Sequence, residues 1–99
     1  MKYSFHLKAK EEFLEAINYY ESRSTGLGLE FANEIYSTIQ RIIQFPTAGS
    51  KFSENTRRCL AQRFPFGVIY KVSEDKDETI IIAVMQVNRK PGYWKKRVE

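Results

Sequence analysis

Cysteine and histidine are nearly absent from this sequence of 99 residues, which contains one of each. The single Cys59 cannot form a disulfide within the chain, and no Cys/His cluster has the spacing of a structural zinc site. The sequence therefore predicts no disulfide framework, no metal site and no cofactor. One unpaired cysteine is typical of a reducing compartment, and we expect a cytoplasmic protein.

Long hydrophobic runs and low-complexity stretches are missing too. No apolar run approaches the length of a membrane span, and the N-terminus alternates polar and apolar residues where a signal peptide has an apolar core. Hydrophobic residues make up 42% of the chain and charged residues 28%, which is the profile of a packed globular protein. We expect one domain, residues 1–99, with no membrane partner.

Charge is unevenly distributed along the chain. Residues 1–50 contain five Lys/Arg and six Asp/Glu, whereas residues 51–99 contain 11 and six, so the two halves carry about −1 and +5. Clustered cations gain from contact with phosphates or carboxylates, which favours nucleic acid or an acidic protein as a partner. A solvated basic face would explain the same excess.

The N-terminal residues change from strand to helix periodicity. Residues 2–8 place Tyr3, Phe5 and Leu7 on one side, and this alternation predicts a half-buried strand. From residue 9 the apolar positions follow the helical period, which predicts an amphipathic helix over residues 9–23.

A turn and a second helix follow. Ser24 and Thr25 are candidate N-caps for this helix, which carries an apolar stripe and stops by Pro46. The short connection predicts an antiparallel helical hairpin.

Three strand-like runs occupy the second half. We expect strands over residues 57–64, 67–73 and 79–87, after a loop at 46–55 and with a hairpin loop at 74–78. The last run is apolar on both faces and is therefore expected to be central. Strict alternation would place Ile80, Ile82 and Val84 on one face and Ile81, Ala83, Met85 and Val87 on the other.

The predicted fold is α+β in the order β-α-α-β-β-β, with the helical hairpin packed on a small, mainly antiparallel sheet. Several cationic and aromatic residues follow or flank the predicted strands. Arginine donates paired hydrogen bonds to phosphate, and Tyr and Trp offer faces for base stacking, but the same residues are enriched at protein interfaces. The candidate target-binding residues are Arg57, Arg58, Arg63, Arg89, Tyr93, Trp94, Lys95 and Lys96.

The other polar residues are weaker candidates for a functional site. We interpret His6 as a polar-face residue of the first strand and Cys59 as a small half-buried residue. Glu11, Glu12 and Glu15 are interpreted as an acidic cluster favoured by the dipole at the N-terminus of the first helix.

Three segments resemble the RelE/ParE superfamily of toxins from bacterial type II toxin–antitoxin modules. They read RRCLAQRFPFGVIYKV (57–72), TIIIAVMQVNRKPGYWKKR (79–97) and EEFLEAINYYESRSTGLGLEFANEI (11–35). The resemblance implies a growth inhibitor, associated in some modules with plasmid stabilisation, that a cognate antitoxin neutralises. The antitoxin is expected to contribute a largely disordered segment that folds onto the toxin.

Two branches of the superfamily differ in their target. ParE-like members are described as inhibitors of DNA gyrase, which requires binding alone. RelE-like members are ribosome-dependent endoribonucleases that cleave mRNA by positioning a base, an acid and cations around the scissile phosphate. A non-toxic interaction domain is the third alternative.

Carried over by position, the catalytic residues of a ribonuclease would be Arg58, Arg63, Arg89 and Tyr93. The chain departs from the RelE-like pattern at two places, because Gly67 stands where an arginine is common and Gln86 where a histidine is common. Glycine offers no side chain to a phosphate, and a glutamine amide does not act as a general acid or base. The resemblance therefore favours the ParE-like branch.

Overall fold

The first strand pairs with the last one, although most of the chain separates them. The computed structural model describes residues 2–98, and its sheet has the order β1-β5-β4-β3-β2. Strand β1 is parallel to β5, and the remaining pairs are antiparallel. In chain order the elements are β1 (Lys2–Phe5), α1 (Leu7–Arg23), α2 (Leu27–Gln44), β2 (Ser50–Lys51), β3 (Arg57–Leu60), β4 (Phe66–Ser73), β5 (Glu78–Gln86) and the short 3₁₀ helix η1 (Lys95–Arg97).

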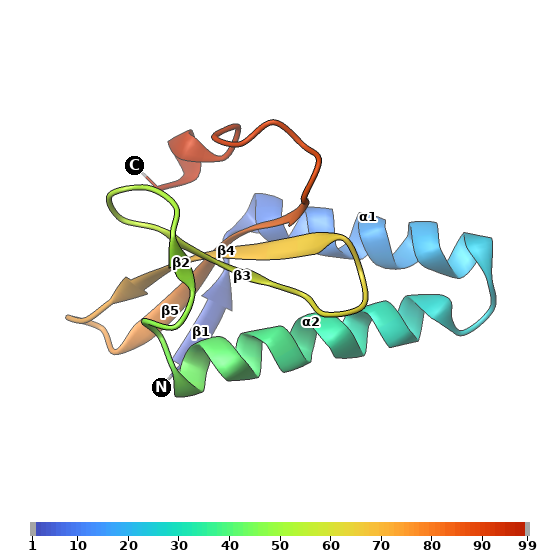
Figure 1. Ribbon diagram of the computed structural model, residues 1–99, viewed down its shortest axis with the longest axis horizontal. Helices are drawn as coiled ribbons and strands as arrows, with labels where there is room; N and C mark the ends of the chain where they lie inside the picture. The colour runs from blue at the N-terminus through green and yellow to red at the C-terminus, as the bar shows by residue number, and fades with distance from the viewer. Residues whose placement is uncertain (1, 99) are drawn as a thin grey trace.

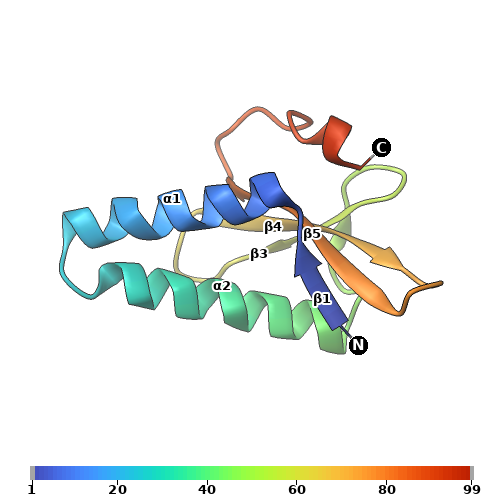
Figure 2. The same ribbon diagram turned by 180° about the vertical axis from the view of Figure 1, so that it is seen from behind.

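The predicted α+β fold is confirmed, and the last strand is central as expected. The helical hairpin covers one face of the sheet, and the residues after β5 run back toward the β2–β3 loop (Figures 1 and 2). Several details differ from the prediction. Strand β3 ends at Leu60 rather than at residue 64, and the short strand β2 lies within the predicted loop at 46–55.

Helix α1 begins two residues earlier than the periodicity predicted. The Nδ1 atom of His6 accepts a hydrogen bond from the backbone N–H of Lys8 at 3.1 Å, so His6 caps the helix. The chain leaves the strand at Phe5, and the side chain of Leu7 is 68% exposed rather than buried beside Tyr3 and Phe5. The interpretation of His6 as a strand residue was therefore wrong.

Helix α2 is capped from the preceding helix. Its N-cap is Gly26, with φ of +89°, rather than Ser24 or Thr25. The carboxylate of Glu21 accepts hydrogen bonds from the backbone N–H groups of Gly26 and Gly28, at 3.1 and 3.0 Å. These N–H groups belong to the start of a helix and have no partner within it, so Glu21 supplies the acceptor that a local cap would have provided.

Two apolar clusters lie on opposite faces of β4 and β5. The first joins the helices to the sheet and includes Phe13, Phe31, Ile35, Tyr70 and Ile81. The second joins the C-terminal residues to the other face and includes Ile69, Ile82, Ala83, Met85 and Trp94. Burying each large apolar side chain contributes about 1.5–3 kcal/mol, so both clusters stabilise the sheet.

The predicted alternation along the last strand fails at one point. The register between β4 and β5 shifts between Ile69 and Tyr70, whose partners are Ala83 and Ile81. The extra residue, Ile82, and its neighbour Ala83 both join the second cluster. A bulge of this kind puts two consecutive side chains on one face, which the sequence pattern did not reveal.

None of the helices within residues 2–98 is both long enough and apolar enough to cross a membrane.

Candidate functional site

The densest polar cluster of the described residues surrounds the carboxylate of Glu12. Its two oxygens accept hydrogen bonds from Tyr93 Oη at 2.6 Å, from both terminal nitrogens of Arg97 at 2.9 and 3.1 Å, and from the backbone N–H of Val84 at 3.1 Å. Arg89 Nη1 lies 3.6 Å from the same carboxylate. We call Glu12, Arg89, Tyr93 and Arg97 the Glu12 cluster.

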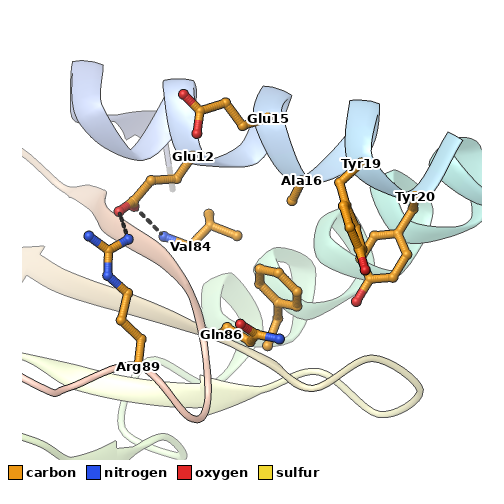
Figure 3. Close-up of a pocket in the computed structure, with 9 residues that line it drawn as sticks. Glu12, Glu15, Ala16, Tyr19, Tyr20, Val84, Gln86 and Arg89 are labelled. Atoms are coloured by element: carbon orange, nitrogen blue, oxygen red, sulfur yellow. Dashed lines mark hydrogen bonds and ion pairs between the residues drawn. The ribbon is translucent and has the colours of Figure 1, made fainter. Parts of the chain in front are cut away.

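The sheet topology explains why Glu12 bonds to a strand. Strand β1 ends its pairing at the Phe5–Ile81 pair, whereas β5 continues to Gln86. The N–H of Val84 lies in this later part of β5, and Glu12 on α1 accepts its hydrogen bond. An unpaired N–H in such a setting would be unfavourable, so the carboxylate replaces a missing strand neighbour. Figure 3 shows this contact and the ion pair with Arg89.

A turn at Gly92 directly precedes Tyr93, whose hydroxyl contacts Glu12. Gly92 has φ of +92°, which glycine tolerates and other residues rarely adopt. The Arg89 guanidinium lies 3.6 Å from the centroid of the Tyr93 ring, and the Arg97 guanidinium lies 5.1 Å from it. Burial, followed by the hydrogen bond to Glu12, raises the pKa of Tyr93 well above its ordinary value. Its hydroxyl is therefore protonated at neutral pH and donates to the carboxylate.

An open groove of about 430 Å³ adjoins the Glu12 cluster. It lies between α1 and the ends of β4 and β5, as Figure 3 shows. The groove has a mixed lining of aromatic, carboxylate, amide and guanidinium groups. The lining residues are Glu12, Glu15, Ala16, Tyr19, Tyr20, Phe66, Val84, Gln86 and Arg89.

The fold brings together only some of the predicted site residues. Arg89 and Tyr93 meet in the Glu12 cluster, and Gln86 lines the groove with Arg89. Arg63 instead pairs with Glu30 of α2 at 2.8 Å. Arg57 donates to the backbone carbonyls of Thr47 and Gly49, at 3.2 and 2.8 Å, and thereby holds the loop before β2.

Arg58 lies on the face of the sheet opposite the helices. Its guanidinium is 4.6 Å from the centroid of the Phe52 ring. A Cβ atom at Gly67 would come within 3.2 Å of the Arg58 side chain, so a larger residue there would force Arg58 to move.

Trp94 is a core residue rather than a surface aromatic. Its side chain is 2% exposed and packs against Phe52, with ring centroids 5.7 Å apart. Burial of this ring argues against the predicted direct contact with a target. The neighbouring Lys95 and Lys96 are exposed.

The role of Glu12 was not expected from the sequence. Its assignment to a dipole-stabilised acidic cluster was wrong, because α1 begins at Leu7 and has no acidic residue in its first turn. One signal was available: Glu12 is three residues after Ala9 and four before Ala16, both of which are buried. A carboxylate at this spacing lies at the edge of the buried stripe and needs partners there.

Within the described residues, no group of three or more His, Cys, Asp or Glu side chains is arranged to hold a metal ion.

Comparisons with known proteins gave one family match and a match in fold. A model of the family described as "ParE toxin of type II toxin-antitoxin system, parDE" matches residues 3–91. A solved structure described as "Chromosomal ParDE TA system from P. aeruginosa" contains a similar chain, with 18% sequence identity and a TM-score of 0.71. The match covers 87% of this chain and 95% of that chain, and at this identity it supports the fold. A search of curated protein sequences found no match.

Proposed function

The chain belongs to the ParE toxin family of type II toxin–antitoxin systems, and we propose that it inhibits growth by binding DNA gyrase until a cognate antitoxin neutralises it. Plasmid stabilisation fits the same family. The proposal requires a binding surface and no bond-breaking by the toxin, and it places the protein in the cytoplasm with its target.

The observation that carries this proposal is the hydrogen bond that the Tyr93 hydroxyl donates to Glu12. A ribonuclease of the RelE-like kind needs a proton acceptor beside the ribose hydroxyl, and the Tyr93 hydroxyl is a protonated donor at 2.6 Å from Glu12. The same carboxylate engages Arg97 and Arg89. Gln86, which lines the groove beside them, does not transfer protons.

The separation of the cations supports the same proposal. Arg63 pairs with Glu30 on α2, and Arg58 lies over Phe52 on the other face of the sheet. A pentavalent phosphate needs cationic groups that converge within hydrogen-bonding distance of it. Arg89 is the predicted site cation that lines the groove, and its side chain is 54% exposed.

The groove suits a folded peptide segment of the antitoxin. Tyr19 lines the groove and is 55% exposed, and Ala16 and Phe66 contribute apolar surface to the lining. A segment that is disordered alone and folds on binding would cover this surface and pair with the charges around it. We therefore propose that antitoxin binding covers Arg89 and prevents its contact with gyrase.

The deciding experiment combines two assays of the purified protein with one assay in cells. We expect inhibition of DNA supercoiling by gyrase, intact mRNA in a translating extract, and growth arrest on expression that a co-expressed cognate antitoxin relieves. Cleaved mRNA with normal supercoiling would instead favour the ribosome-dependent ribonuclease. Normal growth in cells that contain the folded protein would favour a non-toxic interaction domain.

Replacing Arg89 with alanine tests the site itself. We expect gyrase inhibition to fall at least about fivefold, because truncating an arginine at an interface hot spot removes more than about 1 kcal/mol of binding free energy. The control is Lys76→Ala, which removes an exposed cation from the β4–β5 loop. Circular dichroism should show that both variants are folded. A folded Arg89→Ala protein with full potency would remove Arg89 from the site.

A further inference from the structure

The C-terminal segment (residues 87–98) is attached mainly through side chains. Among the described residues, its backbone bonds to earlier parts of the chain lie at its start, where Val87 donates to Pro65 and Arg89 to Gln86. Later backbone bonds join neighbours within the segment, as in η1. Figure 1 shows the segment leaving β5 and running back toward the β2–β3 loop. A segment held in this way depends on a few specific contacts.

Most of the polar contacts that fix this segment end on Glu12. Tyr93 and Arg97 both bond to this carboxylate, and Arg89 forms an ion pair with it. Arg97 also donates to the carbonyl of Ile82 at 3.0 Å. The side chains of Glu12 and Arg97 are only 13% and 14% exposed, so solvent screens their paired hydrogen bonds little.

The same contacts determine the direction of Arg89. Its guanidinium stacks on Tyr93 at 3.6 Å, and Tyr93 is itself held by Glu12. The ion pair with Glu12 restrains a second side of the guanidinium, while the groove side remains open. Loss of Glu12 would therefore remove a direct and an indirect restraint on Arg89 at once.

We propose that Glu12 is a positioning residue, which docks the C-terminal segment and thereby orients Arg89 toward the bound target. The proposal rests on the proposed function in one respect, namely that Arg89 contacts the target. Docking of the segment by Glu12 is a property of the free protein and is measured separately.

The protein contains its own probe of docking. Trp94 is the only tryptophan, lies within the segment and is 2% exposed. Its fluorescence and its quenching by acrylamide report whether the segment is docked. Far-UV circular dichroism reports the helices. None of the residues in the apolar cluster around Trp94 belongs to α1 or α2.

The principal variant is Glu12→Gln. Glutamine has one acceptor oxygen for the donors that now share two, and it carries no charge to pair with Arg97. We expect unchanged helical circular dichroism, a red-shifted and more readily quenched Trp94, and gyrase inhibition weakened about tenfold or more. The matched control is Glu11→Gln, because Glu11 is exposed on the same helix and pairs with Lys8. Its docking and inhibition should equal those of the wild type.

A second variant keeps the proposal testable if Glu12→Gln does not fold, since Glu12 also supports β5. Arg97→Met removes the segment's largest contact with Glu12 and leaves the bond from Val84 to Glu12 intact. It should release Trp94 in the same way and weaken inhibition. In a double-mutant cycle, Glu12→Gln and Arg97→Met should be strongly non-additive.

The outcomes separate the two proposals. A folded Glu12→Gln or Arg97→Met protein with Trp94 still shielded would overturn docking by Glu12. Exposed Trp94 with undiminished gyrase inhibition would overturn the positioning of Arg89. If the wild-type protein does not inhibit gyrase at all, the proposed function fails, while the quenching of Trp94 still decides whether Glu12 docks the segment.

Discussion

At the scale of single residues, Glu12 shows how one carboxylate can serve several elements. It accepts from the backbone of β5 through Val84 and from two side chains of the C-terminal segment, Tyr93 and Arg97. Hydrogen bonds to an ionised acceptor are stronger than those between neutral groups, and the low exposure of Glu12 preserves this difference. The carboxylate thus stabilises the fold and shapes the groove.

Tyr93 gives a prediction at this scale. Its pKa is raised in the folded protein by burial and by the hydrogen bond to Glu12, so the folded state holds the phenolic proton more tightly than the unfolded state. The associated stability is fully present below about pH 10, where an unfolded tyrosine is still protonated. It is lost progressively as the pH rises above that value.

Urea denaturation at several pH values, with the wild type and Tyr93→Phe, tests this dependence of stability on pH. At pH 7 the variant should be less stable by about 1.5–3 kcal/mol, because it lacks a hydrogen bond to a charged group. The difference should shrink between about pH 10 and 11. A constant difference over that range would contradict the assignment, since Tyr20 and Tyr70 are present in both proteins.

At the scale of elements, the helical hairpin depends on a close approach at the start of α2. A Cβ atom built on Gly28 would lie 2.8 Å from the carbonyl oxygen of Ile17 and 3.0 Å from the Cβ of Glu21. The backbone of α2 thus packs directly on α1. Glu21 completes the connection by accepting the N–H groups of Gly26 and Gly28.

Gly28→Ala tests this packing. Alanine is the better helix former, yet we expect a loss of about 1–3 kcal/mol in the free energy of unfolding, because the added methyl overlaps backbone atoms of α1. Gly26→Asn is the control: a Cβ atom there meets nothing within 4 Å, and asparagine tolerates a left-handed backbone. Thermal unfolding should show a larger loss for Gly28→Ala than for Gly26→Asn.

At the scale of the whole molecule, β4 and β5 belong to both apolar clusters. Tyr70 and Ile81 face the helices, while Ile69 and Ile82 face Trp94. In the wild type we expect the two faces to unfold together, because both clusters are built on the same two strands.

Cooperative unfolding is therefore the final prediction. In the wild type, helical circular dichroism and Trp94 fluorescence should give the same midpoint in urea. In Glu12→Gln the two signals should no longer coincide, because Trp94 is already exposed before the helices and the sheet unfold. Separate transitions in the wild type would show that the segment is independent of the sheet.

The sequence by itself determined the family and the order of the elements apart from the short strand β2. Period-two and period-3.6 patterns depend on which side chains a single strand or helix buries, so they are visible locally. The motifs at residues 57–72 and 79–97 carried the resemblance for the same reason, since each is a continuous stretch of chain.

Tertiary structure alone decided which polar residues meet. Glu12 and Arg97 are 85 positions apart, and their contact depends on β1 ending early, on α1 lying beside the part of β5 that β1 does not pair with, and on the return of the C-terminal segment. Neither residue's local pattern contains the partner. Burial of Trp94 and the separation of Arg58 and Arg63 from Arg89 follow from the same packing, because the sheet has two faces and the sequence does not state which one each loop will cover.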